Sequence, residues 1–488
     1  MKTIIGCKKW LLLYSTFSLI LFVSFGCGNS SNEAQSFIVA VSLQDTENIP
    51  DDATHLHYIL LDAEGNREYL QPEYSIAGRN TIEVPINTKT IIAQFHDANH
   101  EILQEVIEIL AYEGSTSPGD NSQAVQLKNY NYWMTHDFDV QGASLAEITI
   151  PGAHDAGMGK IASCSSYAGA DVTKTQQMSF GGMLNSGIRY FDIRPVIDKY
   201  GRMYLGHFTW VGTDINIGIH KFTLRNEGCY GFTVEGMLED VRKFLAKSDN
   251  HEVIILKMSH FLDFEKYDVK GSTFDKADLH RLKLQVIEAL DGYLLKGNDD
   301  FRNTRISALT KDGAKVIVTF DADDYDGSEG IYSQKYLKLY DESSDTNNLD
   351  KMIDDQFKKM DEYGREIGRP VNPYVTSVDA NGKCYGQCKE WLAFEEAIDK
   401  KRLAKDYFIL SWTLTQSEHQ IIGCMIGDIG RPFGYVCKPL QQLDAAANKN
   451  IVSKIAKQCN RKKVFPNVVY TDNAGAETTR ASMNLPHL

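Results

Sequence analysis

The chain has 488 residues, with 51 Lys and Arg against 65 Asp and Glu, which gives a formal net charge of −14. Hydrophobic residues make up 43% and charged residues 24%; these ordinary values exclude a chain that is disordered throughout, a collagen-like repeat and a multi-span membrane protein. The acidic balance argues against nucleic acid as the main partner and against electrostatic adhesion to anionic membranes.

Residues 1–27 have the pattern of an export signal. Three early lysines precede an apolar run that is too short and too polar for a convincing spanning helix. Cys27 follows a glycine and opens a polar tract, which resembles a bacterial lipoprotein signal, although Ser24 stands where leucine is usual. We predict an exported lipoprotein, at the cell surface or in the periplasm, with its lipid anchor at Cys27. The alternative is an ordinary secretory signal and a secreted protein.

Seven cysteines follow the signal segment, and export permits disulfides. Their odd number leaves at least one thiol unpaired, and the pairing cannot be read from the sequence. Cys384 and Cys388 match neither the CxxC redox motif nor a zinc ligand pair, which favours a loop disulfide or a buried thiol.

Residues 28–128 have a β-like texture. Short runs of β-branched and aromatic residues are separated by turn signals, as in a small sandwich of the immunoglobulin kind. The runs lie at 37–41, 57–61, 81–85 and 90–95. No catalytic constellation stands out here, so we predict a spacer or binding module.

Residues 129–488 show a different pattern. Apolar strand-like runs alternate here with segments whose apolar residues have helical spacing, such as 234–245 and 279–290. The strand-like runs lie at 147–151, 187–193, 253–258, 315–320, 374–378, 407–412 and 467–471. Runs that are apolar throughout are typical of parallel strands buried on both faces. The pattern predicts an α/β fold, either a closed barrel or a doubly wound sheet, with its chemistry at the carboxyl ends of the strands.

Charged side chains collect where the first two of these strands end. His154 and Asp155 follow the first strand, Asp192 and Arg194 end the second, and His207 comes shortly after. Any one of them alone would be an ordinary structural residue. Together they equip a site for phosphodiester cleavage. One imidazole takes a proton from the attacking hydroxyl, the other protonates the leaving oxygen, and a guanidinium stabilises the phosphate charge.

Three runs carry a specific resemblance, and they lie at 150–155, 187–194 and 206–207. Together they resemble the X domain of phosphatidylinositol-specific phospholipase C, most closely its bacterial and X-domain-only members. Weaker motifs extend the likeness from about residue 130 to the C-terminus. The resemblance implies a TIM-like, irregular β/α barrel over 129–488. It also implies cleavage of phosphatidylinositol, or a related glycosylated inositol phospholipid, at a membrane surface, giving diacylglycerol and a cyclic inositol phosphate.

The resemblance also assigns roles by position. His154 becomes the general base for the inositol 2-hydroxyl, and His207 the general acid for the diacylglycerol oxygen. Arg194 becomes the phosphate clamp. Asp155 would support the acid and the arginine, and Asp472 would orient His154. Because the substrate supplies its own nucleophile, the first step gains a large entropic advantage.

Metal and substrate contacts follow from departures within the family. Arg194 stands where calcium-dependent relatives have a carboxylate ligand, so we predict catalysis with no metal and no other cofactor. Lys257 matches a substrate-contacting lysine, with an ordinary rim lysine as the alternative. Trp412 is a candidate to stack on a sugar ring, with a barrel-lining role as the alternative. No arginine follows the strand at 315–320, which puts strict phosphatidylinositol specificity in doubt.

Two other functions stay open. A metal-dependent glycerophosphodiester phosphodiesterase has a similar barrel, but its usual His-Arg-Gly run is absent from this sequence. A catalytically inactive surface lipoprotein that binds glycans or proteins would explain the sandwich and the missing inositol-site arginine, whereas retention of both histidines argues against it.

Overall fold

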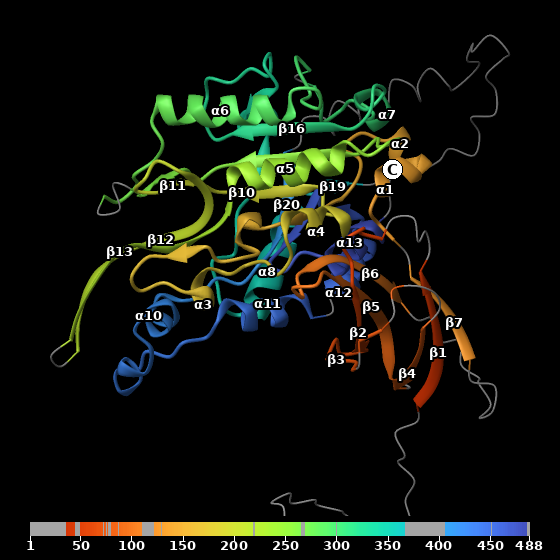
Figure 1. Cartoon of the computed structure of the whole chain (residues 1–488), viewed down its shortest axis with the longest axis horizontal. Helices are drawn as coiled ribbons and strands as arrows, with labels where there is room; N and C mark the ends of the chain where they lie inside the picture. Colours follow the sequence, from red (N-terminus) through yellow and green to blue (C-terminus); the bar gives the residue numbers. More distant parts are fainter. Residues whose placement is uncertain are drawn as a thin grey trace, which may run out of the picture.

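The computed structural model describes residues 36–485, apart from 44–48, 72, 75, 77–79, 86, 110–121, 128, 218–219, 265–268, 299, 367–405 and 450 (Figure 1). The predicted signal segment with Cys27, the predicted strand at 374–378, and Cys384 and Cys388 lie outside the described residues. Among the residues that are described, no helix has the length and apolarity needed to cross a bilayer.

The first part of the chain forms two sheets that share one core. One sheet has the order β4-β1-β7 and the other the order β3-β2-β5-β6. The strands are β1 (Ser36–Leu43), β2 (His55–Asp62), β3 (Arg67–Tyr69), β4 (Asn80–Pro85), β5 (Thr88–His96), β6 (Ile102–Ile109) and β7 (Ser122–Leu127). Val39, Tyr58 and Phe95 are among the buried side chains between the sheets. The runs predicted as strands correspond to β1, β2, β4 and β5.

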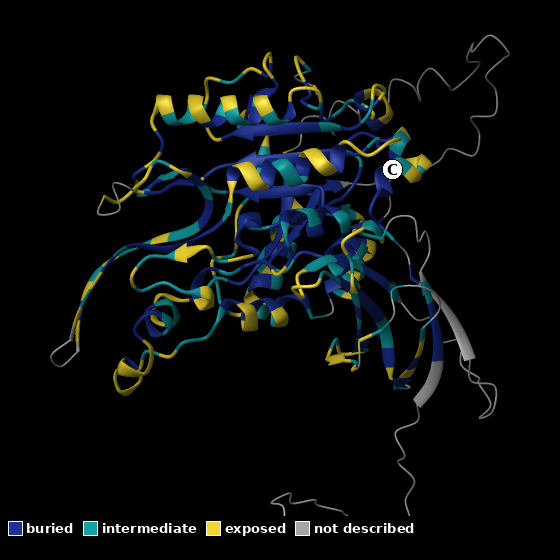
Figure 2. Ribbon diagram, in the orientation of Figure 1, coloured by how far each residue is buried: buried dark blue, intermediate teal, exposed yellow. Residues whose placement is uncertain are grey.

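The outer face of the β2-β5-β6 sheet is also covered. Ile59, Ile92 and Ile107 pack in one apolar cluster with Trp133 and other barrel residues. Gln104 donates hydrogen bonds to the side chain of Asn129 and to the backbone oxygen of Asn185. The sandwich therefore lies against the barrel as part of a continuous interior (Figure 2).

The larger sheet of the barrel is parallel throughout and has the order β17-β16-β14-β10-β8-β22-β20-β18. Its strands are β8 (Ile150–Ala153), β10 (Tyr190–Ile193), β14 (Val253–Met258), β16 (Lys315–Phe320), β17 (Ile331–Ser333), β18 (Leu339–Tyr340), β20 (Tyr407–Trp412) and β22 (Val468–Thr471). The two edge strands, β17 and β18, are consecutive in the chain and are joined by residues 334–338. The sheet thus curls into a TIM-like, irregular barrel, which confirms the predicted fold class.

Helices surround this sheet (Figure 1). They are α1 (Trp133–His136), α2 (Phe138–Gly142), α3 (Ala170–Thr173), α4 (Phe180–Asn185), α5 (Val234–Leu245), α6 (Lys276–Leu290), α7 (Ile306–Leu309), α8 (Leu349–Tyr363), α10 (Glu418–Ile426), α11 (Leu440–Asn448), α12 (Ile451–Lys462) and α13 (Ala476–Met483). The helical spacing predicted over 234–245 and 279–290 corresponds to α5 and α6. Thr233 caps α5 by accepting the Gly236 backbone N–H, and the apolar face of α5 is buried.

A second, mostly antiparallel sheet rises from the carboxyl end of β10. Its order is β15-β11-β12-β13-β9. The strands are β9 (Ser163–Cys164), β11 (Pro195–Ile197), β12 (Met203–Ile217), β13 (His220–Thr233) and β15 (Leu262–Asp263). A short pair, β19 (Arg365–Glu366) with β21 (Val464–Phe465), closes the opposite end. The sequence pattern did not predict the long β12-β13 ribbon, because its side chains are half-exposed and lack a continuous apolar run.

Candidate active site

The first histidine of the site is placed by two neighbouring strands. β8 pairs in parallel with β22, and Ala153 lies opposite Thr471. The residues that follow, His154 and Asp472, are therefore adjacent, and His154 Nδ1 lies 2.7 Å from Asp472 Oδ1. The Asp155 backbone has a positive φ of 43°, which turns the chain sharply after the histidine.

Arg194 comes from the end of β10, the other neighbour of β8. Its Nη2 lies 2.8 Å from His154 Nε2, and its Nη2 and Nε lie 3.2 Å from Asp192 Oδ2. Its Nε also pairs with Asp155 Oδ1. Only about a fifth of the Arg194 side chain is exposed, so the guanidinium lies mostly among these partners.

His207 reaches the same point from β12. Its Nδ1 lies 3.3 Å from Asp155 Oδ2, a contact with ion-pair distance but without hydrogen-bond alignment. The same Asp155 oxygen lies 3.8 Å from His154 Nε2. The fully buried carboxylate of Asp155 thus contacts both imidazoles and the Arg194 guanidinium. The structure brings these predicted residues together, and Asp472 with them.

Lys257, at the end of β14, also reaches the site. Its Nζ lies 3.2 Å from Asp192 Oδ1 and 2.8 Å from Asp341 Oδ2. The Tyr470 hydroxyl donates a hydrogen bond to Asp341 Oδ1, the other carboxylate oxygen, over 3.0 Å. Burial works against the charged ammonium, but Asp192 and Asp341 outweigh it and raise the pKa of Lys257 above its ordinary value. Sequence reasoning missed Asp341, because it follows β18, a strand of two residues that leaves no periodic signal.

Trp412 does not lie in the cavity. Its side chain is fully buried in the core between β20 and the helices outside it, and its indole N–H donates to the Ala447 backbone oxygen over 2.7 Å. The expectation that Trp412 contacts a sugar ring is therefore wrong. In a buried parallel strand successive side chains point to opposite faces, and Trp412 belongs to the outer face.

These residues open into a cavity of about 300 Å³. One wall is charged, and the opposite wall is apolar where α10 and α11 contribute Ile421, Met425 and Leu440. Hydroxyl and carboxylate groups complete the lining at Asp341, Ser343, Asp345, Thr413 and Thr415. The cavity is thus charged where His154, Arg194 and His207 line it and apolar toward α10.

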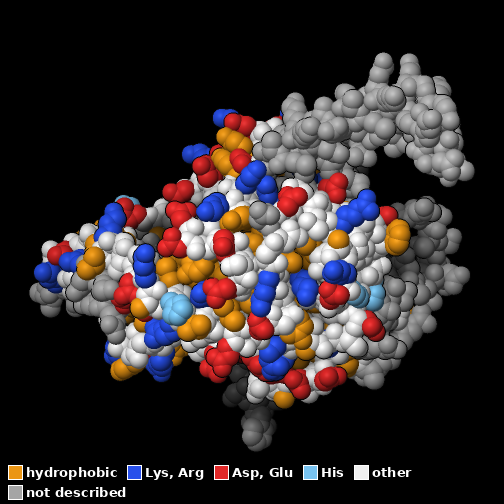
Figure 3. All heavy atoms as spheres, turned by 90° about the horizontal axis from the view of Figure 1, so that it is seen from above, with side chains coloured by type: hydrophobic (Ala, Val, Ile, Leu, Met, Phe, Trp, Pro, Cys, Tyr) orange, Lys and Arg blue, Asp and Glu red, His pale blue; other side chains and the backbone are white. Residues whose placement is uncertain are grey.

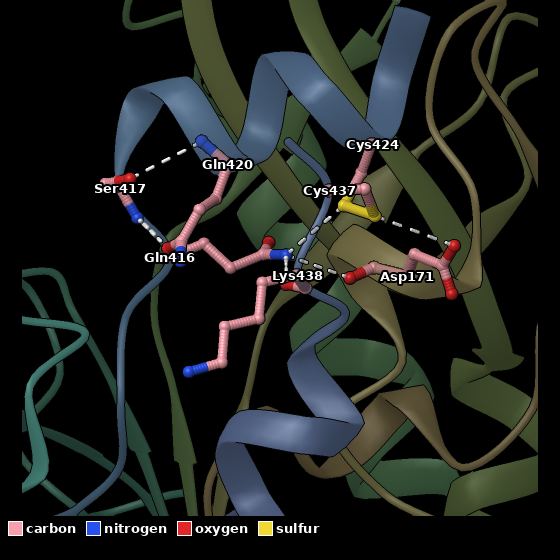
Figure 4. The surroundings of a disulfide bond; sticks show 7 residues. All are labelled: Asp171, Gln416, Ser417, Gln420, Cys424, Cys437 and Lys438. Carbon is pink, nitrogen blue, oxygen red and sulfur yellow. Dashed lines mark hydrogen bonds between the residues drawn. A yellow bond between two sulfur atoms is a disulfide. The ribbon is translucent and has the colours of Figure 1, made fainter. Parts of the chain in front are cut away.

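A disulfide fixes the apolar wall (Figure 4). Cys424 of α10 is bonded to Cys437, just before α11. Gln416, which precedes α10, donates from Nε2 to the backbone oxygens of Lys438 at 2.6 Å and Asp171 at 3.1 Å, so the start of α10 is hydrogen-bonded to α3. One disulfide and these hydrogen bonds therefore hold α10 in place.

A second disulfide stands beside His207. Cys164 of β9 is bonded to Cys229 of β13, and Cys229 is the strand partner of His207 in β12. Cys459 is a free and buried thiol, in keeping with the odd cysteine count.

The two imidazoles differ in their protonation. Burial disfavours a charged His154, but Asp472 and Asp155 outweigh it and raise the pKa of His154 to about 9. Burial lowers the pKa of His207, and Asp155 only partly offsets this. Because a guanidinium only donates hydrogen bonds, His154 Nε2 accepts from Arg194 only while the ring is neutral. Protonation of His154 and its hydrogen bond with Arg194 therefore exclude each other.

Asp444 of α11 stands behind Asp472 and was not singled out in the sequence. It is almost fully buried, and the Asn473 side-chain amide donates to its Oδ2 over 3.2 Å. Burial and the neighbouring Asp472 raise the pKa of Asp444 to about 11. At neutral pH Asp444 is therefore a neutral acid beside the carboxylate that orients His154. It lies within a helix rather than at a strand end, so no strand pattern marks it.

The donor groups of His154, Asp155 and Asp192 lie within 4.8 Å of one another, a spacing that could hold a metal ion. Arg194 contacts all three of these side chains. A cation among them would face a fixed positive charge, so the donor set fits the guanidinium better than a metal.

No family model matches the chain. Among curated proteins, the PI-PLC X domain-containing protein 3 of Mus musculus is 28% identical over 178 residues, which cover 31% of this chain and 47% of that protein. This match confirms the resemblance to the phosphatidylinositol-specific phospholipase C X-domain family. The chain spans about half the length of this relative.

Solved structures similar to the chain include two bacterial phospholipases. The phosphatidylinositol-specific phospholipase C from Listeria monocytogenes has 14% identity and a TM-score of 0.42, and covers 74% of this chain and 100% of its own. A mutant of the Staphylococcus aureus enzyme has 14% identity and a TM-score of 0.43, and covers 73% of this chain and 98% of its own. The barrel fold of the chain is established by its own strand order.

Proposed function

We propose that the chain is a phosphodiesterase that cleaves phosphatidylinositol, or a glycosylated inositol phospholipid, to diacylglycerol and a cyclic inositol phosphate. One observation carries the proposal: the buried Asp155 carboxylate contacts His154, Arg194 and His207 at the wall of one cavity. A base, an acid and a phosphate-binding cation within reach of one carboxylate form the minimum apparatus for this reaction.

The reaction begins when the anionic phosphate draws the Arg194 guanidinium away from His154. The reactive molecules have a neutral His154 and a protonated His207, and they are a small fraction near pH 7 because the pKa of His154 is raised and that of His207 is lowered. In these molecules His154 Nε2 is now a free acceptor and takes the proton of the inositol 2-hydroxyl, and Asp472 stabilises the imidazolium that forms. The inositol oxygen bonds to phosphorus while the bond from phosphorus to the diacylglycerol oxygen breaks. His207 gives its proton to that leaving oxygen. Arg194 stabilises the charge that grows on the nonbridging oxygens.

The cavity favours a polar headgroup over a lipid chain. At about 300 Å³ it is at the lower end of small-molecule pockets, which range from about 300 to 1,000 Å³. Its hydroxyl and carboxylate groups can accept and donate hydrogen bonds to a polyol, and Lys257 holds Asp341 in place among them. The acyl chains then remain outside, in the bilayer.

Apolar side chains near the cavity offer a contact with that bilayer. Ile429, Phe433 and Val436 are exposed on the short segment between α10 and Cys437, next to the apolar wall of the cavity. Insertion of Ile429, Phe433 and Val436 among lipid headgroups would hold the cavity at the interface. Over the face seen from above in Figure 3, acidic and basic side chains are interspersed.

The grouping of His154, Asp155 and Asp192 motivates a second candidate, a metal-dependent phosphodiesterase that acts on glycerophosphodiesters. In that case a divalent cation would displace Arg194 from the three donors and activate water. The two candidates differ in their need for metal and in their product, because water as nucleophile gives no cyclic phosphate.

The deciding experiment incubates the purified chain with vesicles of phosphatidylinositol, phosphatidylcholine or phosphatidylglycerol in excess EDTA, and follows the products by phosphorus NMR. A cyclic inositol phosphate signal from the inositol lipid in EDTA is expected. Turnover only after divalent metal is restored, without cyclic product, would establish the second candidate. Retention of the lipid without any product, with and without metal, would overturn both.

A further inference from the structure

The β-sandwich carries a cluster of histidines far from the proposed chemistry. His55 and His57 lie on the same face of β2, and His96 of β5 is the strand partner of His55. His100 stands in the turn between β5 and β6, and Glu73 belongs to the connection between β3 and β4. From this juxtaposition we infer that His55, Glu73 and His100 form a binding site for a divalent transition metal, with zinc as the best match.

The donor atoms already have the spacing that a shared ion requires. His55 Nε2 lies 3.5 Å from Glu73 Oε2, and His100 Nδ1 lies 3.8 Å from Glu73 Oε1. All three donors lie within 4.8 Å of one another. These separations exceed an ordinary hydrogen bond. Donors about 2.0–2.1 Å from a tetrahedral zinc ion are roughly 3.3 Å apart, so a small contraction around the ion completes the geometry.

The backbone holds two of the ligands ready. His55 Nδ1 lies 3.2 Å from the Asp97 backbone oxygen, and donation of its N–H there leaves Nε2 as the free acceptor that a metal needs. Asp97 also accepts the backbone N–H groups of Asn99 and Glu101, which shapes the turn that carries His100. His100 has a positive φ of 61° within this turn. A carbonyl that orients the imidazole and a fixed turn are the supports expected around a metal ligand.

Two more histidines stand behind these ligands. His57 Nε2 lies 3.6 Å from Glu73 Oε1, and the His57 and His96 rings are in edge contact with centroids 4.8 Å apart. His96 Nδ1 contacts the His100 backbone oxygen at 3.1 Å, and its buried Nε2 has no hydrogen-bond partner. His57 therefore lies close enough to Glu73 to supply a fourth ligand.

The donor set selects the kind of ion. Imidazole nitrogens with one carboxylate suit zinc, nickel and copper, whereas calcium and magnesium require mostly oxygen ligands. An ion here would tie three separate segments, β2, the β3-β4 connection and the β5-β6 turn. The inference concerns the sandwich alone and holds whether or not the barrel cleaves lipid.

The test is a titration of the EDTA-stripped full chain with Zn²⁺, followed by calorimetry and by thermal unfolding. Wild type is expected to bind one equivalent at the cluster and to unfold at higher temperature with Zn²⁺. His55→Ala and Glu73→Gln should each weaken this binding by at least the roughly 10–100-fold that loss of an outer-shell partner causes. His280→Ala, which removes an exposed histidine of α6, is the matched control and should bind as wild type.

A further control variant is needed at His154, because His154, Asp155 and Asp192 form a second group of side chains that could bind the added zinc. His154→Ala should leave the cluster equivalent intact. Unchanged binding and unchanged thermal shift in both His55→Ala and Glu73→Gln would overturn the inference, as would the absence of saturable binding by the wild type. Circular dichroism of each variant without metal separates lost binding from lost folding.

Discussion

Strand β10 is flanked by two arginines whose surroundings differ. Arg189, just before the strand, is fully buried; its Nε donates to Glu252 over 2.7 Å, and its other nitrogens donate to the backbone oxygens of Leu184, Ile188 and Asn131. Arg194, just after the strand, borders the cavity and shares its donors with carboxylates and with an imidazole. The first guanidinium is enclosed among fixed acceptors, whereas the second borders open space. In this barrel the amino end of the sheet holds a structural arginine, and the proposed chemistry lies at the carboxyl end.

Given this difference between the two ends of the sheet, we expect the largest loss of activity at His154. His154→Ala removes the proposed base at the reactive end, and turnover of the inositol lipid should fall by about 10²–10⁴-fold. The melting temperature should stay close to that of wild type, because the ring is partly exposed to the cavity. Diacylglycerol release and differential scanning calorimetry measure the two quantities. A variant with full activity would refute the assignment of His154.

Arginine-to-lysine substitutions at both ends form a matched pair. Arg194→Lys keeps the charge but loses the planar fork, so kcat should fall by roughly 10²-fold with little change in stability. Arg189→Lys leaves buried carbonyl oxygens without donors, at about 1–3 kcal/mol each, while its folded fraction should keep the wild-type kcat. Urea unfolding and active-site-normalised rates separate these outcomes. Equal effects of the two variants on kcat would contradict the division between the two ends.

The pH profile tests the pair of imidazoles. Because the pKa of His154 is raised to about 9 and that of His207 is lowered, kcat/KM should rise through the lower pKa and fall above about pH 9. Each limb should change the rate about tenfold per pH unit. In His207→Ala only the neutral form of His154 is still required, so the residual activity should rise up to about pH 9 and lose the fall above it. A fall above about pH 9 that persists unchanged in this variant would assign it to another group.

The smallest expected effect concerns Asp444 and Asp472. The raised pKa of Asp444, about 11, implies a neutral carboxylic acid at neutral pH. Asp444→Asn is also neutral and similar in shape, so kcat should stay within about twofold of wild type. Asp472→Asn weakens the hydrogen bond that orients His154, about 1.5–3 kcal/mol, and should lower kcat by roughly tenfold or more. Steady-state kinetics on both variants measure the difference.

Stability gives a second readout for Asp444. In wild type the folded protein keeps this proton up to about pH 11, whereas the unfolded chain loses it near its ordinary pKa of 3.8. Unfolding free energy therefore falls as pH rises between these values, and Asp444→Asn should remove that slope. Parallel curves for the two proteins in urea from pH 5 to 9 would contradict the buried neutral acid.

The sequence predicted the central strands well, because β14, β16 and β20 are apolar on both faces and their predicted and observed bounds agree. It also indicated which residues converge, since His154, Arg194 and Asp472 follow neighbouring strands. It could not indicate Asp341 or Asp444, which come from a two-residue strand and a helix. It misplaced Trp412, because a strand apolar on both faces gives no sign of which side chains point inward.

The disulfide between Cys164 and Cys229 links the proposed acid to the redox state of its surroundings. It joins β9 to the strand that pairs with β12 at His207, whereas His154 has no such covalent neighbour. Thiol reductants would therefore loosen the strands around His207, whereas His154 would stay fixed by its parallel sheet. In a reducing compartment the protein would hold a base without a fixed proton donor.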